Sequence, residues 1–284
     1  MDWRTLVRVD ELDEALDAPD LVLVDCRFDL RDPGAGRRAY LAGHIPGAVF
    51  ADLERDLSDP TRSNRGRHPL PDGPAFCARL AQWGITRETQ VVVYDTSHGS
   101  IAARLWWMLR LLGHERVAVV DGGVSAWVAA GLPLESEVPK PLAGRYSARF
   151  NVRAIATTAE VAARMASGNG TLIDARAPER FRGEIEPIDP VAGHVRGAVN
   201  RPYAANLKTD GRFKSSARLA REFSELLGTT APGEVMLMCG SGVTACHNLL
   251  AMAHAGIDGA RVYAGSWSEW ISDPSRPIAR HEHG

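Results

Sequence analysis

The sequence predicts an α/β protein of two similar domains, each a small parallel sheet with helices on both faces. Three observations lead to this prediction. The chain has 284 residues, enough for two domains of ordinary size. Short apolar runs alternate with stretches of helical periodicity, the pattern of a parallel sheet covered by helices. The same order of segments also occurs twice along the chain.

The first copy contains four runs in order. Leu21–Arg27 reads LVLVDCR, and it is followed by AGHIPGAVF over Ala42–Phe50. Val91–Asp95, VVVYD, precedes a helical stretch, and Val117–Trp127 reads VAVVDGGVSAW. These runs have the length and bounds of buried strands.

The second copy repeats each of these segments. LIDAR over Leu172–Arg176 matches the first run, and AGHVRGAVN over Ala192–Asn200 matches the second. Met236–Cys239 precedes another helical stretch, and Val262–Trp270 reads VYAGSWSEW. We therefore predict one domain over residues 1–135, a linker rich in Pro and Gly over 136–152, and a second domain over 153–284.

Composition excludes several classes of partner. The formal net charge is −2, so there is no basic field for nucleic acid or an anionic membrane. No stretch approaches the roughly 18 consecutive apolar residues of a membrane span, and we expect no membrane association. Four cysteines (Cys26, Cys77, Cys239 and Cys246) lack disulfide or zinc spacing, which indicates reduced thiols and a cytoplasmic location.

The most informative stretch surrounds Cys239. The apolar run Val235–Met238 ends at this cysteine, Gly240 and Gly242 follow, and helical spacing begins at Ala245. The first amides of a helix have no intrahelical partner, and glycines allow successive N–H groups to converge on one point. A thiolate is favoured at such a position, which predicts a nucleophilic cysteine that carries a covalent intermediate.

The loop Cys-Gly-Ser-Gly-Val-Thr-Ala resembles the active-site loop of the rhodanese superfamily, and specifically its mercaptopyruvate sulfurtransferase branch. Three further motifs resemble structural signatures of this family: Asp-x-Arg, Gly-His-Ile-Pro-Gly-Ala and Gly-Gly-x-x-x-Trp. For their residues we predict structural roles: a turn cap for Asp25 and Asp174, backbone hydrogen bonds for His44 and His194, and core packing for Trp127 and Trp270.

The resemblance implies two tandem rhodanese-like domains and a two-step sulfur transfer. Cys239 would take the terminal sulfur of a small-molecule donor as a persulfide, and cyanide, a small thiol or thioredoxin would remove it. No metal and no organic cofactor is implied. In the first half Asp95 stands at the cysteine position, and because aspartate cannot accept sulfur, this domain is expected to be catalytically silent.

The resemblance also bears on the donor. Thiosulfate-using relatives typically carry cations in the loop, whereas Gly240, Ser241 and Gly242 are neutral, as in the mercaptopyruvate branch. Val243 and Thr244 complete the expected substrate loop. In that branch the serine assists proton delivery to the pyruvate enolate, together with a histidine and an acid from the silent domain.

His68, in RHPLP, matches that histidine. Glu54 matches the acid, although its spacing to His68 is longer than the family's, and Asp56 is an alternative. Arg180 matches one of two arginines that bind the donor carboxylate, and Arg182 lies close to it. Ile188 or Asp189 stands where the second arginine is expected, and the candidates to substitute for it are Arg182, Arg196 and Arg201.

Other functions remain open. Thiosulfate is the alternative donor, and a non-enzymatic binding module or a sulfur-relay protein is a further alternative. A cysteine phosphatase or arsenate reductase is disfavoured because such loops need Cys-x5-Arg, and Ala245 stands at the arginine position. Cys246 lies inside the predicted helix, where a buried structural thiol is favoured over a resolving cysteine.

Overall fold

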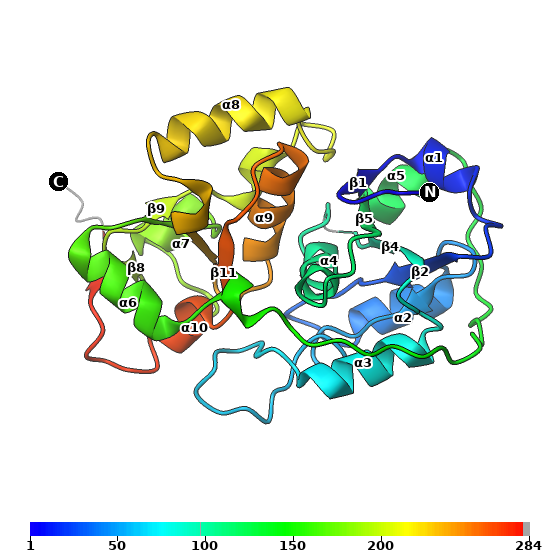
Figure 1. The fold of residues 1–284 in the computed structure, drawn as a ribbon, viewed down its shortest axis with the longest axis horizontal. Helices are drawn as coiled ribbons and strands as arrows, with labels where there is room; N and C mark the ends of the chain where they lie inside the picture. The colour runs from blue at the N-terminus through cyan, green and yellow to red at the C-terminus, as the bar shows by residue number, and fades with distance from the viewer. Residues whose placement is uncertain (97, 281–284) are drawn as a thin grey trace. The chain divides into compact units, whose positions relative to one another are not determined.

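A computed structural model describes residues 1–96 and 98–280 of the chain. The chain forms two compact units. Unit 1 contains Met1–Asp59, Leu70–Asn151 and Thr209–Phe213, and unit 2 contains the rest of the described chain. Figure 1 shows the helices and strands of both units.

Unit 1 is built on a five-stranded sheet in which all paired strands are parallel. Its spatial order is β1-β5-β4-β2-β3, so β4 lies in the centre. Every residue of β4 is buried, as expected for a strand with both faces covered. The strands are β1 (Leu6–Val7), β2 (Leu21–Asp25), β3 (Val49–Phe50), β4 (Gln90–Tyr94) and β5 (Val117–Val120).

Five α-helices accompany this sheet, and Figure 1 shows α4 beside β4 and β5. The apolar side chains of α4 are nearly all buried, which accounts for the long hydrophobic run in this part of the sequence. The helices are α1 (Val9–Asp13), α2 (Ala35–Ala42), α3 (Gly73–Gln82), α4 (Ala102–Leu111) and α5 (Gly123–Ala129).

Unit 2 repeats this sheet with the order β6-β11-β10-β7-β9, again with parallel pairing throughout. The central strand is now β10, which pairs with β7 and β11. A separate antiparallel pair joins β8 to β12. The strands are β6 (Ile155–Ala156), β7 (Thr171–Asp174), β8 (His194–Val195), β9 (Val199–Asn200), β10 (Val235–Met238), β11 (Arg261–Tyr263) and β12 (Ile278–Ala279).

Two helices of unit 2, α6 and α8, begin at side-chain caps. Thr157 and Glu160 form a capping box at α6, and Ser215 caps α8. The α-helices are α6 (Thr158–Ser167), α7 (Pro178–Arg182), α8 (Ser216–Leu227), α9 (Ala245–His254) and α10 (Ser266–Trp270). Three short 3₁₀ turns, η1 (Val152–Ala154), η2 (Tyr203–Asn206) and η3 (Pro232–Glu234), connect them.

The two sheets have the same strand order, which confirms the predicted repeat and the α/β fold class. The signature residues are structural, as predicted. The carboxylates of Asp25 and Asp174 accept the amides of Arg27 and Arg176, at 2.9 and 3.0 Å. His44 and His194 bond the backbone carbonyls of Tyr40 and Phe181, and Trp127 and Trp270 are fully buried.

The units do not follow the predicted boundaries at every point. Residues 60–69 belong to unit 2 although they lie in the first half of the sequence, and 209–213 belong to unit 1. Residues 136–151, expected to form a linker, are also part of unit 1. Residues 60–69 include His68, one of the predicted site residues.

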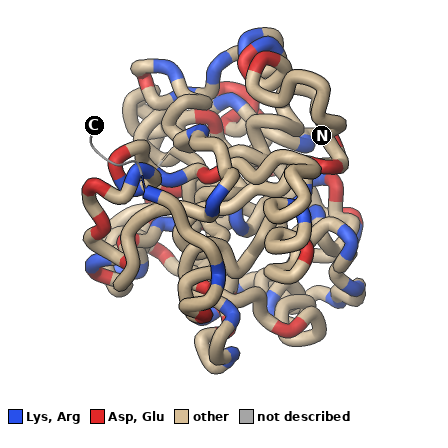
Figure 2. Tube along the Cα trace, turned by 90° about the vertical axis from the view of Figure 1, so that its left-hand side faces the viewer, with Lys and Arg blue, Asp and Glu red and all other residues tan. Residues whose placement is uncertain are grey.

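Charges of both signs are interspersed over the chain. Figure 2 shows Lys and Arg residues and Asp and Glu residues scattered along the trace, in agreement with the net charge of −2. Within the described residues, every helix is too short or too polar to serve as a membrane span.

Candidate active site at Cys239

The candidate nucleophile follows the central strand of the unit 2 sheet. β10 is fully buried, Cys239 comes directly after it, and α9 begins at Ala245. The strand, the turn and the helix lie where the sequence predicts them. Ligands bind at the carboxyl ends of strands in open α/β sheets, so the fold places Cys239 at such an edge. Its side chain is buried, with 2% of the residue exposed.

The loop folds back on the sulfur. The amide of Gly242 donates a hydrogen bond to Cys239 Sγ at 3.2 Å. Gly242 has φ +75°, and a Cβ there would lie 2.2 Å from the carbonyl oxygen of Ala264. Glycine is therefore required for this turn, and the turn directs an amide at the sulfur. Such an amide stabilises a thiolate or a persulfide anion.

The remaining loop residues lie close to the sulfur in the chain. Gly240 and Val243 are buried, and Thr244 precedes the first residue of α9. The carbonyls of Val243 and Thr244 accept the amides of Cys246 and His247, which starts the helical hydrogen bonding. The loop is thus a short, tightly closed connection between β10 and α9.

The segment 264–268, which runs into the start of α10, holds the backbone of Cys239. The hydroxyl of Ser266 accepts the amide of Cys239 at 3.1 Å and donates to the carbonyl of Tyr263 at 2.8 Å. Ser266 has φ +53°, which is uncommon for a residue with a side chain. Two further backbone hydrogen bonds join the start of α10 to the Cys239 loop: Trp267 N donates to Cys239 O, and Ser268 N donates to Gly240 O.

His68 and Ser241 meet beside this loop. The imidazole Nδ1 of His68 lies 2.8 Å from the hydroxyl of Ser241, and both residues are buried. In one tautomer the hydroxyl donates to Nδ1, and in the other Nδ1 donates to the hydroxyl, so the pair can pass a proton in either direction. Sequence analysis places both residues in the site, and the structure brings them together within unit 2.

Arg180 lies near the loop and is held by two carboxylates. Its Nη2 bonds Glu186 Oε1 at 2.7 Å and Asp189 Oδ2 at 3.1 Å, and its Nε bonds both oxygens of Glu186. Burial alone would raise the pKa of Glu186, but hydrogen bonds from Arg180 and from the Asp189 and Ile188 amides outweigh it and hold that pKa below its usual value.

Arg67 is a further cation at this site, and the sequence analysis does not single it out. Its Nη1 bonds Asp189 Oδ1 at 2.6 Å. Its Nη2 lies 3.1 Å from the point where a Cβ on Gly240 would be, so the guanidinium lies over the residue next to Cys239. Two features of the sequence could have identified Arg67 as a site residue: it directly precedes His68, and an acid, Asp189, stands at an expected arginine position.

Other predicted residues lie elsewhere. Arg182 pairs with Glu184, and 40% of its side chain is exposed. Arg201 pairs with Glu222, and Arg196 is exposed. Arg182 and Arg201 are thus paired with carboxylates outside the Cys239 loop, and Arg196 is exposed to solvent.

The predicted acid belongs to unit 1. Glu54 is half-buried, and its amide donates to Asp52 Oδ1 at 2.9 Å. The alternative, Asp56, accepts the Asp52 amide at 2.8 Å and pairs with Arg79 at 2.8 Å. Asp56 is thus committed to structural contacts within unit 1.

All four cysteines are buried and reduced. Cys246 donates from Sγ to the carbonyl of Gly242 at 3.3 Å, one turn earlier in the chain. Burial raises the pKa of the Cys26 thiol well above its ordinary value. The described part of the chain holds no group of three His, Cys, Asp or Glu side chains placed to bind a metal ion.

In unit 1, Asp95 occupies the position that matches Cys239. Asp95 follows β4 as Cys239 follows β10. Its carboxylate accepts three amides, those of Gly99, Ile101 and Ala102, each at 2.8 Å. Unit 1 thus surrounds a side-chain carboxylate with three amides at the strand end where unit 2 directs the Gly242 amide at Cys239 Sγ.

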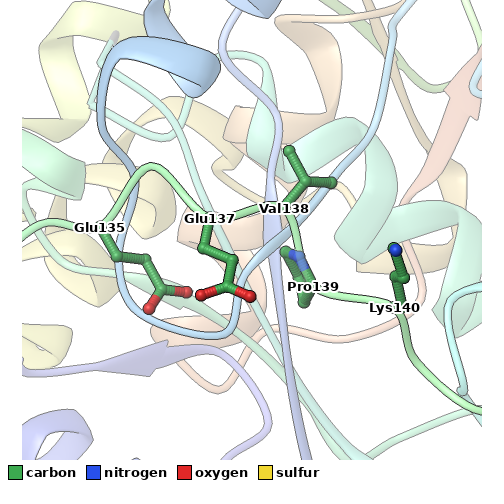
Figure 3. A pocket seen from close by; sticks show the side chains of 5 residues that line it. All are labelled: Glu135, Glu137, Val138, Pro139 and Lys140. Carbon is green, nitrogen blue, oxygen red and sulfur yellow. The ribbon is translucent and has the colours of Figure 1, made fainter.

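Unit 1 also has a pocket, formed by a segment of the chain that follows α5. It is lined by Glu135, Glu137, Val138, Pro139 and Lys140. Figure 3 shows the carboxylates of Glu135 and Glu137 pointing toward one another. Glu135 also accepts the amide of Gly47, and none of the predicted site residues lines this pocket.

Comparisons with known proteins agree with this geometry. A family model, the rhodanese-like domain, matches residues 8–130 and again residues 157–273. The chain therefore belongs to the rhodanese-like family, in two tandem copies. The predicted family and the predicted fold are confirmed.

Several relatives match over nearly the full chain. A Pseudomonas aeruginosa protein named "Probable 3-mercaptopyruvate sulfurtransferase" is 48% identical over 96% of this chain and 97% of its own length. SseB of Mycobacterium tuberculosis, which carries a thiosulfate sulfurtransferase name, is 42% identical over 98% and 97%. The crystal structure of the Escherichia coli 3-mercaptopyruvate sulfurtransferase SseA has a TM-score of 0.79 and 32% identity, covering 94% of this chain and all of that one.

Proposed function

We propose that this protein is a sulfurtransferase that moves a sulfur atom from 3-mercaptopyruvate, through a persulfide on Cys239, to a thiophilic acceptor. The observation that carries the proposal is the neutral loop around Cys239, in which a backbone amide faces the sulfur and Ser241 is bonded to His68. The sulfurtransferase names of the full-length relatives support the same class of reaction.

In the first half-reaction the Cys239 thiolate attacks the thiol sulfur of the donor. A sulfur–sulfur bond forms and the carbon–sulfur bond breaks, and its electron pair passes to the pyruvate enolate. The enolate takes up one proton to give pyruvate. The enzyme keeps a persulfide, which the amide of Gly242 is placed to stabilise.

The departing enolate needs a proton donor. Ser241 adjoins the nucleophile in the loop, and His68 lies 2.8 Å from its hydroxyl. We assign proton delivery to this pair, and we keep Glu54 as the proposed acid. The contacts of Asp56 with Arg79 and with the Asp52 amide favour Glu54 over Asp56 in this role.

The donor carboxylate needs a cation. Arg180 is the proposed carboxylate-binding residue of the second unit, since its guanidinium lies 3.7 Å from the Cβ point of Gly240. The loop residues Val243 and Thr244 are proposed to contribute backbone to the substrate site. Arg182 is a weaker candidate because it pairs with Glu184 on the surface.

In the second half-reaction an acceptor thiolate or cyanide attacks the outer sulfur of the persulfide and regenerates the Cys239 thiolate. Cyanide, small thiols and thioredoxin are the proposed acceptors. The chemistry calls for reduced thiols, so we propose the cytoplasm as its location.

Thiosulfate is the second candidate donor, since SseB and a bovine relative with 35% identity carry thiosulfate sulfurtransferase names. The deciding measurement compares kcat/KM for 3-mercaptopyruvate and thiosulfate with cyanide as acceptor. A preference for mercaptopyruvate of about a hundredfold, or 2.7 kcal/mol, supports the proposal. A preference for thiosulfate overturns it in favour of the second donor.

A further inference from the structure

Two guanidinium groups converge on the loop beside Cys239 from different parts of the sequence. Measured from the Cβ point of Gly240, Arg67 Nη2 lies at 3.1 Å and Arg180 Nη2 at 3.7 Å. A carboxylate oxygen of Asp189 lies at 3.7 Å from the same point. The surface over Gly240 is therefore made of two cations and the anion between them.

The backbone of Arg67 is fixed to the same scaffold as Cys239. Its amide donates to the hydroxyl of Ser268 at 2.9 Å, and the amide of Ser268 donates to the carbonyl of Gly240 at 2.9 Å. Gly66 makes this approach possible, since it has φ +83° and a Cβ there would lie 2.5 Å from the carbonyl of Gly265. The position of Arg67 is thus built into the fold of unit 2.

Arg67 and Arg180 differ in how many of their N–H groups donate hydrogen bonds within the protein. Arg180 bonds Glu186 through Nε and Nη2, and also bonds Asp189. Arg67 bonds Asp189 through Nη1, and its Nε is buried without a hydrogen-bond partner among the described residues. Arg67 therefore holds unused donor capacity, and 26% of its side chain is exposed.

The local charges nearly cancel. Arg67 and Arg180 contribute two positive charges, and Asp189 and Glu186 contribute two negative ones through direct ion pairs. Arg176 also contacts Glu186, at 3.4 Å, but its charge is balanced by Asp174 at 2.7 Å. A site with balanced charge and spare N–H donors favours a monoanion over a dianion, because a second negative charge would lie beside the buried carboxylates of Asp189 and Glu186. 3-Mercaptopyruvate brings one carboxylate, whereas thiosulfate brings two negative charges.

We propose that Arg67 is a donor-binding and specificity-determining residue, which bonds the carboxylate of the sulfur donor and takes the place of the arginine expected at position 188 or 189. Asp189 is its positioning residue and limits the charge of the accepted donor. The inference rests on the proposed sulfurtransferase function and adds to it the residue that selects the donor.

The experiment removes the proposed contact from either side: mutation removes the guanidinium of Arg67, and a changed donor removes the carboxylate. Wild type and the Arg67→Met variant are assayed with 3-mercaptopyruvate and with 1-mercapto-2-propanone, which has the same ketone and thiol but no carboxylate. We expect Arg67→Met to raise KM for mercaptopyruvate tenfold or more and to leave kcat/KM for the propanone within about twofold. Arg65→Met is the matched control, since Arg65 is an exposed arginine of the same segment.

Two further variants separate binding from folding. Arg67→Lys keeps the charge but not the planar fork, and we expect it to retain an intermediate KM for mercaptopyruvate. Asp189→Asn removes one negative charge, and we expect the ratio of kcat/KM for thiosulfate to that for mercaptopyruvate to rise at least fivefold.

The outcomes distinguish this inference from the proposed function. If wild type forms the Cys239 persulfide but Arg67→Met and Arg65→Met behave alike toward mercaptopyruvate, Arg67 does not bind the donor. Equal losses with the two donors would also overturn it, since they indicate a damaged loop. If wild type forms no persulfide with either mercaptopyruvate or thiosulfate, the proposed function itself fails.

Discussion

The imidazole of His68 and the hydroxyl of Ser241 lie 2.8 Å apart although 173 residues separate them in the chain. The contact forms because residues 60–69 leave the first half of the sequence and pack with unit 2. Ser241 is buried in the Cys239 loop and His68 is buried beside it. The imidazole of His68 therefore contacts the hydroxyl of Ser241 in the Cys-Gly-Ser-Gly turn. This contact is the basis for assigning proton transfer to the pair.

His68→Asn should slow pyruvate release from 3-mercaptopyruvate by roughly a hundredfold or more, the usual effect of losing a general acid or base. Asparagine can still bond Ser241, but it cannot carry the proton. The measurement is single-turnover pyruvate release. Thiosulfate is the control donor, because sulfite leaves as a stable anion and needs no proton on carbon. Equal slowing with both donors would mean that His68 acts only by supporting the loop.

Cys239→Ser should abolish persulfide formation, because a hydroxyl at this position is too weak a nucleophile to attack sulfur. Intact-protein mass spectrometry after donor addition gives the readout as the gain of one sulfur atom. Cys246→Ser is the matched control, since this thiol is buried inside α9 and bonds the Gly242 carbonyl. Sulfur transfer retained by Cys239→Ser, or lost equally in Cys246→Ser, would contradict the assignment of the nucleophile.

Asp95→Asn should destabilise unit 1 by about 2 kcal/mol without altering the chemistry at Cys239. Three amides bond the two oxygens of Asp95, and an asparagine keeps one oxygen and turns its NH₂ toward amides that also donate. Urea unfolding followed by circular dichroism measures the change. Asp13→Asn, at an exposed position of α1, should leave the midpoint in place. An unshifted midpoint in Asp95→Asn would show that the carboxylate is not a structural acceptor.

Local sequence features predict the central part of this site well. The apolar run Val235–Met238, the glycines after Cys239 and the helical spacing from Ala245 each specify a short-range structure, and all three elements lie where expected. The repeat predicts the shared strand order, because equal patterns bury equal faces. The strand, turn and helix around Cys239 are predicted because the interactions that form them span only a few residues, whereas the strand order follows from the repeat.

The charge arrangement could not be predicted in the same way. Arg67 and Asp189 are 122 residues apart, and their 2.6 Å contact depends on the packing of residues 60–69 with unit 2. Sequence proximity to Arg180 suggested Arg182 instead, but α7 ends at Arg182, whose side chain pairs with Glu184. Periodicity identifies which faces are buried, but it does not state which distant cation reaches a given anion.

The ion pairs around Glu186 make the stability of unit 2 depend on pH. The carboxylate accepts bonds from Arg180 and from the amides of Ile188 and Asp189, so its folded-state pKa lies below the ordinary value of 4.5 even though burial alone would raise it. A carboxylate with a lowered pKa adds stability that is fully present above the unfolded-state pKa and is lost as the pH falls through the folded-state pKa.

Glu186→Gln should therefore lower the melting temperature at neutral pH, and the difference from wild type should shrink as the pH falls below 4.5, the ordinary value for this group. At acidic pH the wild-type carboxyl also loses its charge, so the two proteins converge. Thermal melts across this range provide the measurement. Glu184→Gln is the control, because its pair with Arg182 is more exposed and contributes little. A gap between Glu186→Gln and wild type that stays constant or widens in acid would contradict the assigned direction of the pKa shift.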